Sequence, residues 1–140
     1  MSAGKTLFSK IIDGEIPCHR VYEDEHVFAF LDIGPLTSGH TLLIPKMPVE
    51  RLEDLPEEVA EALGRALPKL GRAVIKAAGV RDYHVVQKNG SVAGQVVPHV
   101  HFHIIPKPSK KEGLGLRWEP GSLSSSEGAQ MAERIRNELS

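Results

Sequence analysis

Three histidines at every second position, His99, His101 and His103, are the residues of this chain whose type and spacing best suit chemistry. Valine, phenylalanine and isoleucine alternate with them, and this alternation predicts a strand over residues 98–106. Because successive side chains of a strand point to opposite faces, the three imidazoles share one face, with roughly 6.6 Å between neighbours. The sequence therefore predicts a row of imidazoles opposite an apolar surface that belongs in a core.

Three interpretations of this row stay open on spacing alone. The histidines can be ordinary part-buried residues of a core. They can bind a metal, because imidazole nitrogens are common ligands. They can also act in nucleophilic catalysis, with the central imidazole attacking and its neighbours orienting it. The surrounding sequence must decide between these interpretations.

Composition predicts one small soluble domain. The chain has 140 residues, enough for a single compact core, and its net charge of −1 predicts no broad basic surface for nucleic acid. No apolar signal segment opens the sequence and no apolar run is long enough to span a bilayer, so we expect a cytoplasmic protein that does not bind membranes. The lone Cys18 offers no intramolecular disulfide and no cysteine cluster for zinc.

The elements that must position the histidines follow from local patterns. Helices are predicted over residues 7–13, 50–78 and 126–139. Strands are predicted over residues 20–22, 27–31, 41–44 and 83–87, besides the histidine strand. Thr6 can cap the first helix, and Pro68 should kink or interrupt the second. This order predicts an α+β fold with a largely antiparallel sheet, as one domain over residues 1–140 with a flexible segment 1–5 and an irregular loop over 107–125.

The residues before the triad make the pattern more specific. The stretch Asn89-Gly90-x3-Gly94-Gln95-x3-His99-x-His101-x-His103 resembles the signature of the histidine triad (HIT) superfamily of nucleotide-binding hydrolases and nucleotidyl transferases. The resemblance covers nearly the whole chain, including residues 8–17, 22–25, 29–33 and 39–46. These stretches are most similar to the branch that hydrolyses purine nucleoside phosphoramidates, whereas residues 48–52 resemble the dinucleoside polyphosphate hydrolases. The resemblance implies a HIT-like domain with a five-stranded antiparallel sheet, one long helix and two shorter ones.

The resemblance also implies the roles of four histidines. His101 is the nucleophile that forms a nucleotidyl-histidine, His99 orients it, His103 contacts the phosphate and helps the leaving group, and His40 supports the cluster. A neutral imidazole suits this task near pH 7, because its ordinary pKa is about 6.5. The covalent intermediate divides one difficult displacement into two easier ones.

Further positions match the nucleotide-binding residues of the family. Asp32 matches the carboxylate that receives the ribose hydroxyls, with the role of a strand-end turn residue as the alternative. Phosphate contacts are implied for Asn89, Gly94 and Gln95, and the base pocket for Phe8, Phe30 and Ile33, with plain core as the alternative. Val96 stands where the phosphoramidate branch often has serine, which removes one hydroxyl donor.

At the positions where some family members bind a structural zinc, this sequence departs from the family pattern. Some members hold a structural zinc through two cysteines and two histidines, and the positions outside the triad are Thr6, Ser9 and Pro48 here, none of them a useful zinc ligand. We therefore expect no metal and no cofactor. The expected partners are a purine nucleotide substrate and a second copy of the chain in a homodimer. A dinucleoside polyphosphate hydrolase, or a nucleotide-binding interaction module with incidental catalysis, remains the alternative function.

Overall fold

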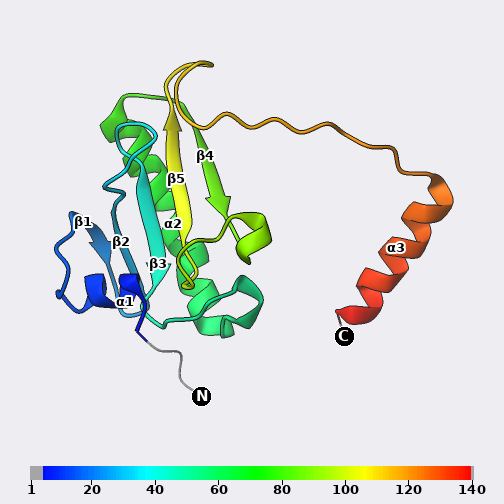
Figure 1. The fold of residues 1–140 in the computed structure, drawn as a ribbon, viewed down its shortest axis with the longest axis horizontal. Helices are drawn as coiled ribbons and strands as arrows, with labels where there is room; N and C mark the ends of the chain where they lie inside the picture. The colour runs from blue at the N-terminus through cyan, green and yellow to red at the C-terminus, as the bar shows by residue number, and fades with distance from the viewer. Residues whose placement is uncertain (1–4, 140) are drawn as a thin grey trace.

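The computed structural model describes residues 5–139 as an α+β domain followed by an extended C-terminal segment (Figure 1). Of the segment predicted to be flexible, residues 1–4 lie outside the described range. Lys5, the last residue of that segment, is described, and its Nζ lies 3.1 Å from Asp13 Oδ2 and 3.0 Å from Glu15 Oε2. In the described part of the chain, no helix is both long and apolar enough to cross a membrane.

One five-stranded sheet forms the centre of the domain. Its strands are β1 (Arg20–Glu23), β2 (Val27–Leu31), β3 (Thr41–Pro45), β4 (Asp82–Gln87) and β5 (Phe102–Lys107). Their order is β1-β2-β3-β5-β4, and all neighbouring pairs are antiparallel. The predicted fold class is therefore confirmed. β1 and β4 are the two edges of the sheet, and β5 lies between β3 and β4.

Three α-helices accompany the sheet: α1 (Leu7–Ile12), α2 (Glu57–Ala78) and α3 (Ser125–Glu138). Two short 3-10 helices, η1 (Leu52–Asp54) and η2 (Ser91–Ala93), lie in the connections. Helix α2 continues through Pro68, so the predicted interruption does not occur. Pro68 lies on the exposed side of the helix, while Leu70 and Val74 on the opposite side are buried. Packing of the apolar side thus maintains the helix despite the backbone hydrogen bond that a proline removes.

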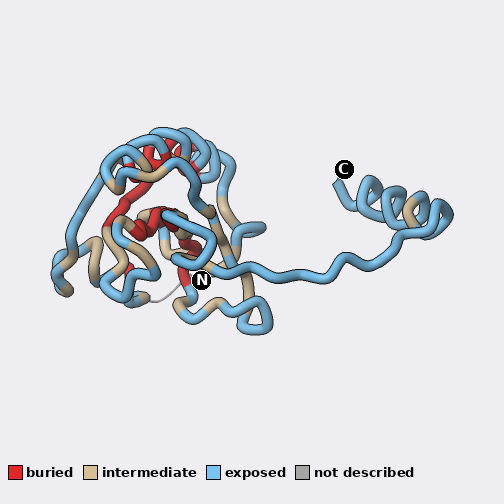
Figure 2. The backbone as a smooth tube through the Cα atoms, turned by 90° about the horizontal axis from the view of Figure 1, so that it is seen from above, coloured by how far each residue is buried: buried red, intermediate tan, exposed pale blue. Residues whose placement is uncertain are grey.

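The two faces of the sheet are covered by different helices. Helix α2 packs on one face, where Leu63 and Leu70 meet Val27, Leu43 and Ile104. Helix α1 covers part of the other face, where a second cluster joins Phe8, Phe28, Phe30, Leu42 and Ile44. Strands β2 and β3 are therefore buried on both sides. Figure 2 shows the buried residues, in red, in the interior of the domain.

The histidine segment begins its strand later than predicted. The strand starts at Phe102, so His99 and His101 precede it, and the prediction of a strand from residue 98 is wrong. The cause is a change of hydrogen-bond partner: the Val100 N–H donates to Val49 O at 2.7 Å and not to β3, whose pairing stops at Phe102. Within the strand the alternation persists, because Phe102 and Ile104 pack in the cluster beneath α2 whereas His103 lines the pocket on the other face.

The C-terminal segment leaves the domain after β5. Residues 108–124 have no regular structure, and α3 stands away from the sheet (Figures 1 and 2). No residue of α3 is buried. Its N-cap is Ser124, whose side chain accepts a hydrogen bond from the Glu127 N–H at 3.2 Å.

Candidate active site

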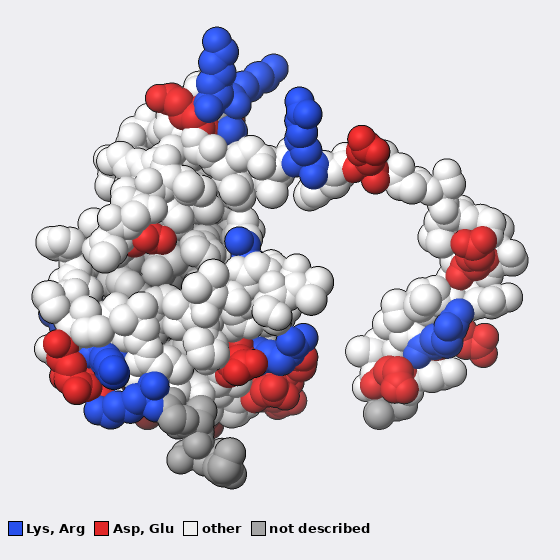
Figure 3. All heavy atoms as spheres, viewed as in Figure 1, with Lys and Arg blue, Asp and Glu red and all other residues white. Residues whose placement is uncertain are grey.

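A pocket of about 360 Å³ opens on the face of the sheet that α1 covers only in part. Seven of the residues proposed from the sequence line it: Phe8, Phe30, Asp32, Ile33, Gly94, His101 and His103. Most of the remaining lining is apolar. Figure 3 shows one acidic and one basic side chain isolated in the uncharged middle of this face, whereas the other charges gather at its periphery. Such a pocket suits a ligand with an apolar ring and few charges.

Among the residues that the structure describes, His101 has a hydrogen-bond partner at Nδ1 and none at Nε2. Its Nδ1 lies 2.7 Å from the carbonyl oxygen of His99, and a carbonyl can only accept, so Nδ1 carries the proton. The lone pair of the neutral ring is therefore on Nε2. Burial lowers the pKa of His101, which keeps the ring neutral at pH 7. Phe8 packs edge-on against this ring, with 5.0 Å between the ring centroids, and limits its rotation.

His99 holds the His101 ring through its own backbone carbonyl. It is fully buried, its Nε2–H donates to Pro45 O at 2.7 Å, and its Nδ1 accepts from the Thr6 hydroxyl at 2.7 Å. Both ring nitrogens are thus used, and the ring does not line the pocket. These two hydrogen bonds fix His99, and so they also fix its backbone carbonyl oxygen, which accepts the hydrogen bond from His101 Nδ1.

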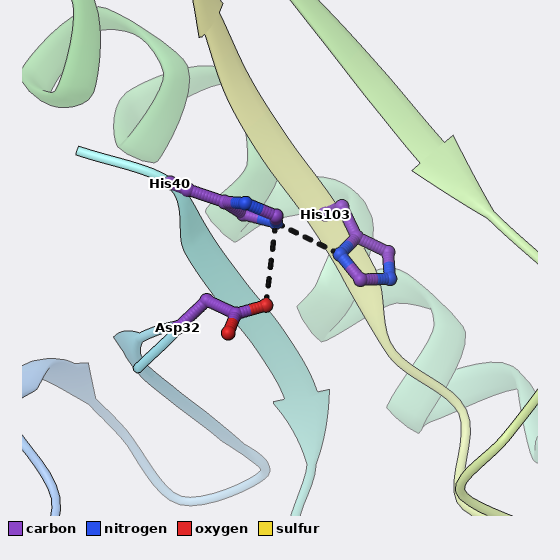
Figure 4. A group of neighbouring side chains, drawn as sticks. All are labelled: Asp32, His40 and His103. Carbon is purple, nitrogen blue, oxygen red and sulfur yellow. Dashed lines mark hydrogen bonds and ion pairs between the residues drawn. The ribbon is translucent and has the colours of Figure 1, made fainter. Parts of the chain in front are cut away.

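His103 is oriented by His40 (Figure 4). The Leu36 N–H donates to His40 Nδ1 at 3.1 Å, so His40 carries its proton on Nε2 and donates to His103 Nδ1 at 2.9 Å. The neutral His103 therefore carries its proton on Nε2. Burial, reinforced by the neighbouring His101 and His40, lowers the pKa of His103 to about 4. His103 consequently offers a hydrogen-bond donor while remaining uncharged at pH 7.

Asp32 completes the only group of three metal-ligating side chains that the described residues bring together, with His40 and His103. Its Oδ2 lies 3.5 Å from His40 Nε2, and its Oδ1 accepts from the Gly34 N–H at 2.8 Å. A metal on His40 Nε2 would force the His40 proton onto Nδ1, where the Leu36 N–H already donates. This order of protons favours a hydrogen-bonded relay over a metal site.

The predicted replacement of zinc ligands by hydroxyls has a structural counterpart. Thr6 Oγ1 lies 2.7 Å from His99 Nδ1 and 3.2 Å from Ser9 Oγ. Two hydroxyls beside one imidazole form a hydrogen-bonded cluster and lack the thiolates that structural zinc requires. The residues present therefore do not fit a structural zinc, and a metal-free protein stays our prediction.

The two predicted amide ligands of phosphate lie outside the pocket lining. Gln95 accepts from the Gly90 N–H at 2.8 Å and donates to Glu50 O at 2.8 Å and Val97 O at 3.0 Å. Asn89 accepts from the Leu52 N–H at 2.8 Å and exchanges two hydrogen bonds with Gln87. Both side chains hold the loop over 88–97 in place, and direct contact with phosphate stays a prediction for each.

Most backbone N–H groups at the end of the same loop are already used in hydrogen bonds within the loop. The N–H groups of Gly94 and Gln95 donate to Ser91 O and Gly90 O, both at 3.0 Å. In the described part of the chain the Val96 N–H has no acceptor, and Val96 lines the pocket. Gly94 has a φ of 90°, which favours glycine. The loop therefore leaves the Val96 N–H available to an anion in the pocket.

Lys88 is a lining residue that the sequence interpretation missed. It follows β4 directly, and β4 pairs Val86 with His103. Side chains two residues apart in a strand share a face, so Lys88 lies on the same face of the sheet as Val86 and His103. The antiparallel register places Lys88 on the side of His103 that is nearer to His101. The alternation of β4, extended by one residue, was the signal that could have found it. Lys88 is the only Lys or Arg among the lining residues.

Comparison with known proteins shows the family of the chain. Residues 13–110 match the model of the HIT domain family. A Schizosaccharomyces pombe protein named adenosine 5′-monophosphoramidase is 41% identical over 133 residues, covering 95% of this chain and 97% of the relative. A Saccharomyces cerevisiae protein of the same name is 44% identical over 123 residues, covering 84% and 75%. The crystal structure of a HIT family protein from Bacillus anthracis superposes with a TM-score of 0.94 at 37% identity, covering 99% and 100%.

Proposed function

The chain belongs to the HIT domain family, and from this premise we propose that this hydrolase cleaves nucleoside 5′-phosphoramidates and related nucleotidyl compounds at the α-phosphorus. The observation that carries the proposal is the free Nε2 lone pair of His101, fixed at the pocket by the bond from Nδ1 to the His99 carbonyl. Two relatives named adenosine 5′-monophosphoramidase support the choice of substrate.

The pocket offers complementary contacts for each part of a nucleotide. Phe8 and Phe30 form an apolar wall for the base, and Ile33, which is 89% exposed, lies at the rim where it can cover the ring. Asp32 can accept hydrogen bonds from the ribose hydroxyls. The α-phosphate then lies beside His101, where Lys88 contributes a positive charge.

The proposed reaction has two steps. His101 Nε2 forms a bond to the α-phosphorus as the bond from phosphorus to the amine nitrogen breaks, and the amine leaves with one added proton. Water then attacks the nucleotidyl-histidine, gives up one proton and releases the nucleoside monophosphate. His103 Nε2–H donates a hydrogen bond to the phosphate, and a bound phosphate raises the pKa of His103. With this higher pKa, His103 can give a proton to the leaving amine in the first step and take one from water in the second.

The decisive experiment compares two substrate classes on one preparation. We expect kcat/KM for adenosine 5′-phosphoramidate to exceed that for diadenosine tri- or tetraphosphate at least about tenfold, which requires about 1.4 kcal/mol of differential transition-state binding. The physical reason is that a polyphosphate leaving group needs several cations, and the pocket lining has one.

The comparison is run with and without magnesium. A preference for the diadenosine compound, and above all one that depends on magnesium, would assign the protein to the dinucleoside polyphosphate hydrolases. A denaturing quench at alkaline pH, where a bond from phosphorus to imidazole survives, should also trap a mass increase of one adenylyl group on the wild type and none on His101→Ala.

A further inference from the structure

Helix α3 carries an apolar side that the domain leaves exposed. Met131, Ile135 and Leu139 recur every four residues, so they lie along one side of the helix, and 47%, 55% and 79% of their surfaces are exposed. Leu123 extends the same side, because it packs against α3 at Gly128, where a side-chain Cβ would lie 3.2 Å from Leu123 Cδ2. Among the described residues none covers this side, since α3 has no buried residue.

A helix of this length needs a partner. Helix α3 has 14 residues, and an isolated helix shorter than about 12–15 residues is marginal in water. The Ser124 cap satisfies a backbone N–H group of the first turn only. Because helices in proteins gain most of their stability from packing of an apolar side, α3 requires a surface that its own domain does not provide.

Related crystal structures show that the position of α3 is shared. Residues 108–139 make up nearly a quarter of the chain. The crystal structures of HIT family proteins from Bacillus anthracis and Bacillus subtilis cover 99% and 98% of this chain with TM-scores of 0.94 and 0.93. Scores this high require that residues 108–139 superpose together with the domain. Two separate proteins thus hold the helix in one place away from the sheet, and a contact that belongs to the protein explains this agreement.

The direction in which this segment leaves the domain is fixed by local contacts. Gly113 has a φ of 89° and lies so close to β5 that a side-chain Cβ would be 3.1 Å from Pro106 O. Leu114 and Leu116 then line a pocket together with Val86 of β4. From there the chain passes the β4 edge, and α3 turns back along that side of the molecule (Figures 1 and 3). The domain therefore directs its C-terminal helix toward the side of the uncovered edge strand.

A second copy of this chain fits this arrangement. The edge strand β4, with the exposed Tyr83 and Val85, can pair with another chain, and a copy that pairs there lies between the domain and α3. A two-fold contact is reciprocal, so each copy gives an arm and receives one. We propose that the C-terminal arm, residues 117–139, packs the apolar side of α3 on a second copy, and that the dimer exchanges its two arms. This inference goes beyond the proposed reaction and does not depend on it.

The exchange couples the folding of α3 to association. Burial of Met131 and Ile135 removes apolar surface from water at two contacts in each dimer, because both copies supply an arm. The same contact supplies the packing that a 14-residue helix needs. The affinity of the dimer and the helix content of residues 125–138 should therefore rise and fall together.

The first test measures the dissociation constant of the dimer by sedimentation over a range of concentrations. Met131→Gln together with Ile135→Gln should raise this constant at least about hundredfold, because four apolar side chains per dimer lose their contact. Glu133→Gln, on the opposite side of α3, is the matched control and should change the constant by less than about twofold. An unchanged constant in the double variant, or a wild type that stays monomeric, would overturn the inference.

The second test identifies the copy that α3 contacts. Ile135→p-benzoylphenylalanine is photoactivated in an equal mixture of ¹⁵N-labelled and unlabelled chains after exchange of subunits, and cross-linked peptides are assigned by mass. We expect peptides that join residues 125–138 of one isotopic form to the domain of the other. Cross-links that stay within single chains would show that the arm folds back on its own domain. That result, or the absence of any cross-link to a domain, would contradict the exchange.

The third test uses trypsin, which cleaves after arginine, on α3 itself. Arg134 and Arg136 lie in this helix. At equal concentration, cleavage after these two residues should be at least about tenfold slower in the wild type than in the Met131→Gln and Ile135→Gln double variant, because a packed helix resists local unfolding. Equal cleavage rates would refute the coupling. All three measurements are independent of turnover, so an inactive enzyme with exchanged arms would refute the proposed function alone.

Discussion

At the scale of single residues, the site is a set of imidazoles that are chemically distinct because each has a different hydrogen-bond partner. The His99 carbonyl puts the proton of His101 on Nδ1, and the Leu36 N–H puts that of His40 on Nε2. His103 Nδ1 accepts a hydrogen bond from His40 Nε2–H, so the proton of His103 is on Nε2, where it can be donated. The three triad members are therefore not interchangeable, although their spacing in the sequence is uniform.

The first prediction concerns the nucleophile. His101→Ala should lower the turnover of a phosphoramidate on the order of 10⁶-fold, because it removes the attacking atom. His99→Ala should act mainly on stability and lower the free energy of unfolding by about 2–4 kcal/mol, since it leaves a cavity and unpaired partners at Thr6 and Pro45.

Activity assays and urea unfolding on the same variants separate these effects. His19→Ala, at an exposed histidine outside the pocket, is the matched control and should behave as wild type. Equal turnover by His101→Ala and wild type would refute the covalent mechanism.

The second prediction concerns pH. Burial lowers the pKa of His101, and that of His103 falls to about 4, so kcat/KM should stay level as the pH drops through 6.5 and decline only nearer pH 4 to 5. Between pH 6.5 and 4 the unfolded chain binds more protons than the folded one, so stability should fall as the pH falls through this range. The loss from His103 is on the order of 3 kcal/mol.

Rate profiles and urea unfolding at pH 7, 6, 5 and 4 measure the two effects. A half-maximal rate at pH 6.5, with stability constant down to pH 4, would contradict the buried, neutral state of these rings.

At the scale of elements, distant segments meet at the triad. The N-cap residue of α1, Thr6, reaches His99 across 93 residues of sequence. Gln95 ties the loop over 88–97 to Glu50 O, just before η1. The short α1 contributes Phe8, which packs against the rings of both His99 and His101. The first helix thus positions the His101 ring in addition to forming one wall of the pocket.

The third prediction tests this link. Thr6→Val removes a hydroxyl that accepts from the Ser9 N–H and donates to His99. We expect a loss of stability of about 1–2 kcal/mol from the cap. We also expect kcat to fall roughly tenfold with little change in KM, because misplacing a catalytic group acts on the chemical step.

Thr6→Ser should restore both quantities. Ser124→Ala, which removes the N-cap of α3 away from the pocket, should leave kcat unchanged and is the matched control. A Thr6→Val enzyme with wild-type kcat would show that the cap and the site are independent.

At the scale of the whole molecule, one edge of the sheet and the C-terminal segment present apolar groups to solvent. Tyr83 and Val85 on the edge strand β4 are 39% and 48% exposed. Helix α3 exposes Met131 and Ile135 one turn apart. An uncovered edge with exposed apolar residues invites pairing with another chain.

The fourth prediction is a homodimer in which β4 and α2 contribute to the contact, as the family resemblance implies. Sedimentation at micromolar concentration should give the mass of two chains, and Val85→Asp should shift the protein to monomers by placing a charge in the paired edge. Val21→Asp, on the opposite edge strand β1, is the control and should remain dimeric. A wild-type monomer at that concentration would refute the assembly.

The sequence alone determined most of the helices and strands and the family to which the triad points. Periods of two and of 3.6 residues reflect which side of a strand or helix meets the core, so the five strands, the long helix and the opposite facing of His103 and Ile104 were readable locally. The family resemblance also pointed to Phe8, Phe30, Asp32 and Ile33, and all four line the pocket.

Only the tertiary structure decided which hydrogen-bond partners the site residues have and which of their side chains face the pocket. The strand begins at Phe102 because Val100 pairs with Val49, and Pro68 is tolerated because α2 packs on the sheet. The protons of His101 and His103 depend on carbonyl and N–H groups that no local pattern identifies. Lys88 faces the pocket while Asn89 and Gln95 turn toward the loop, since register and long-range hydrogen bonds set those directions.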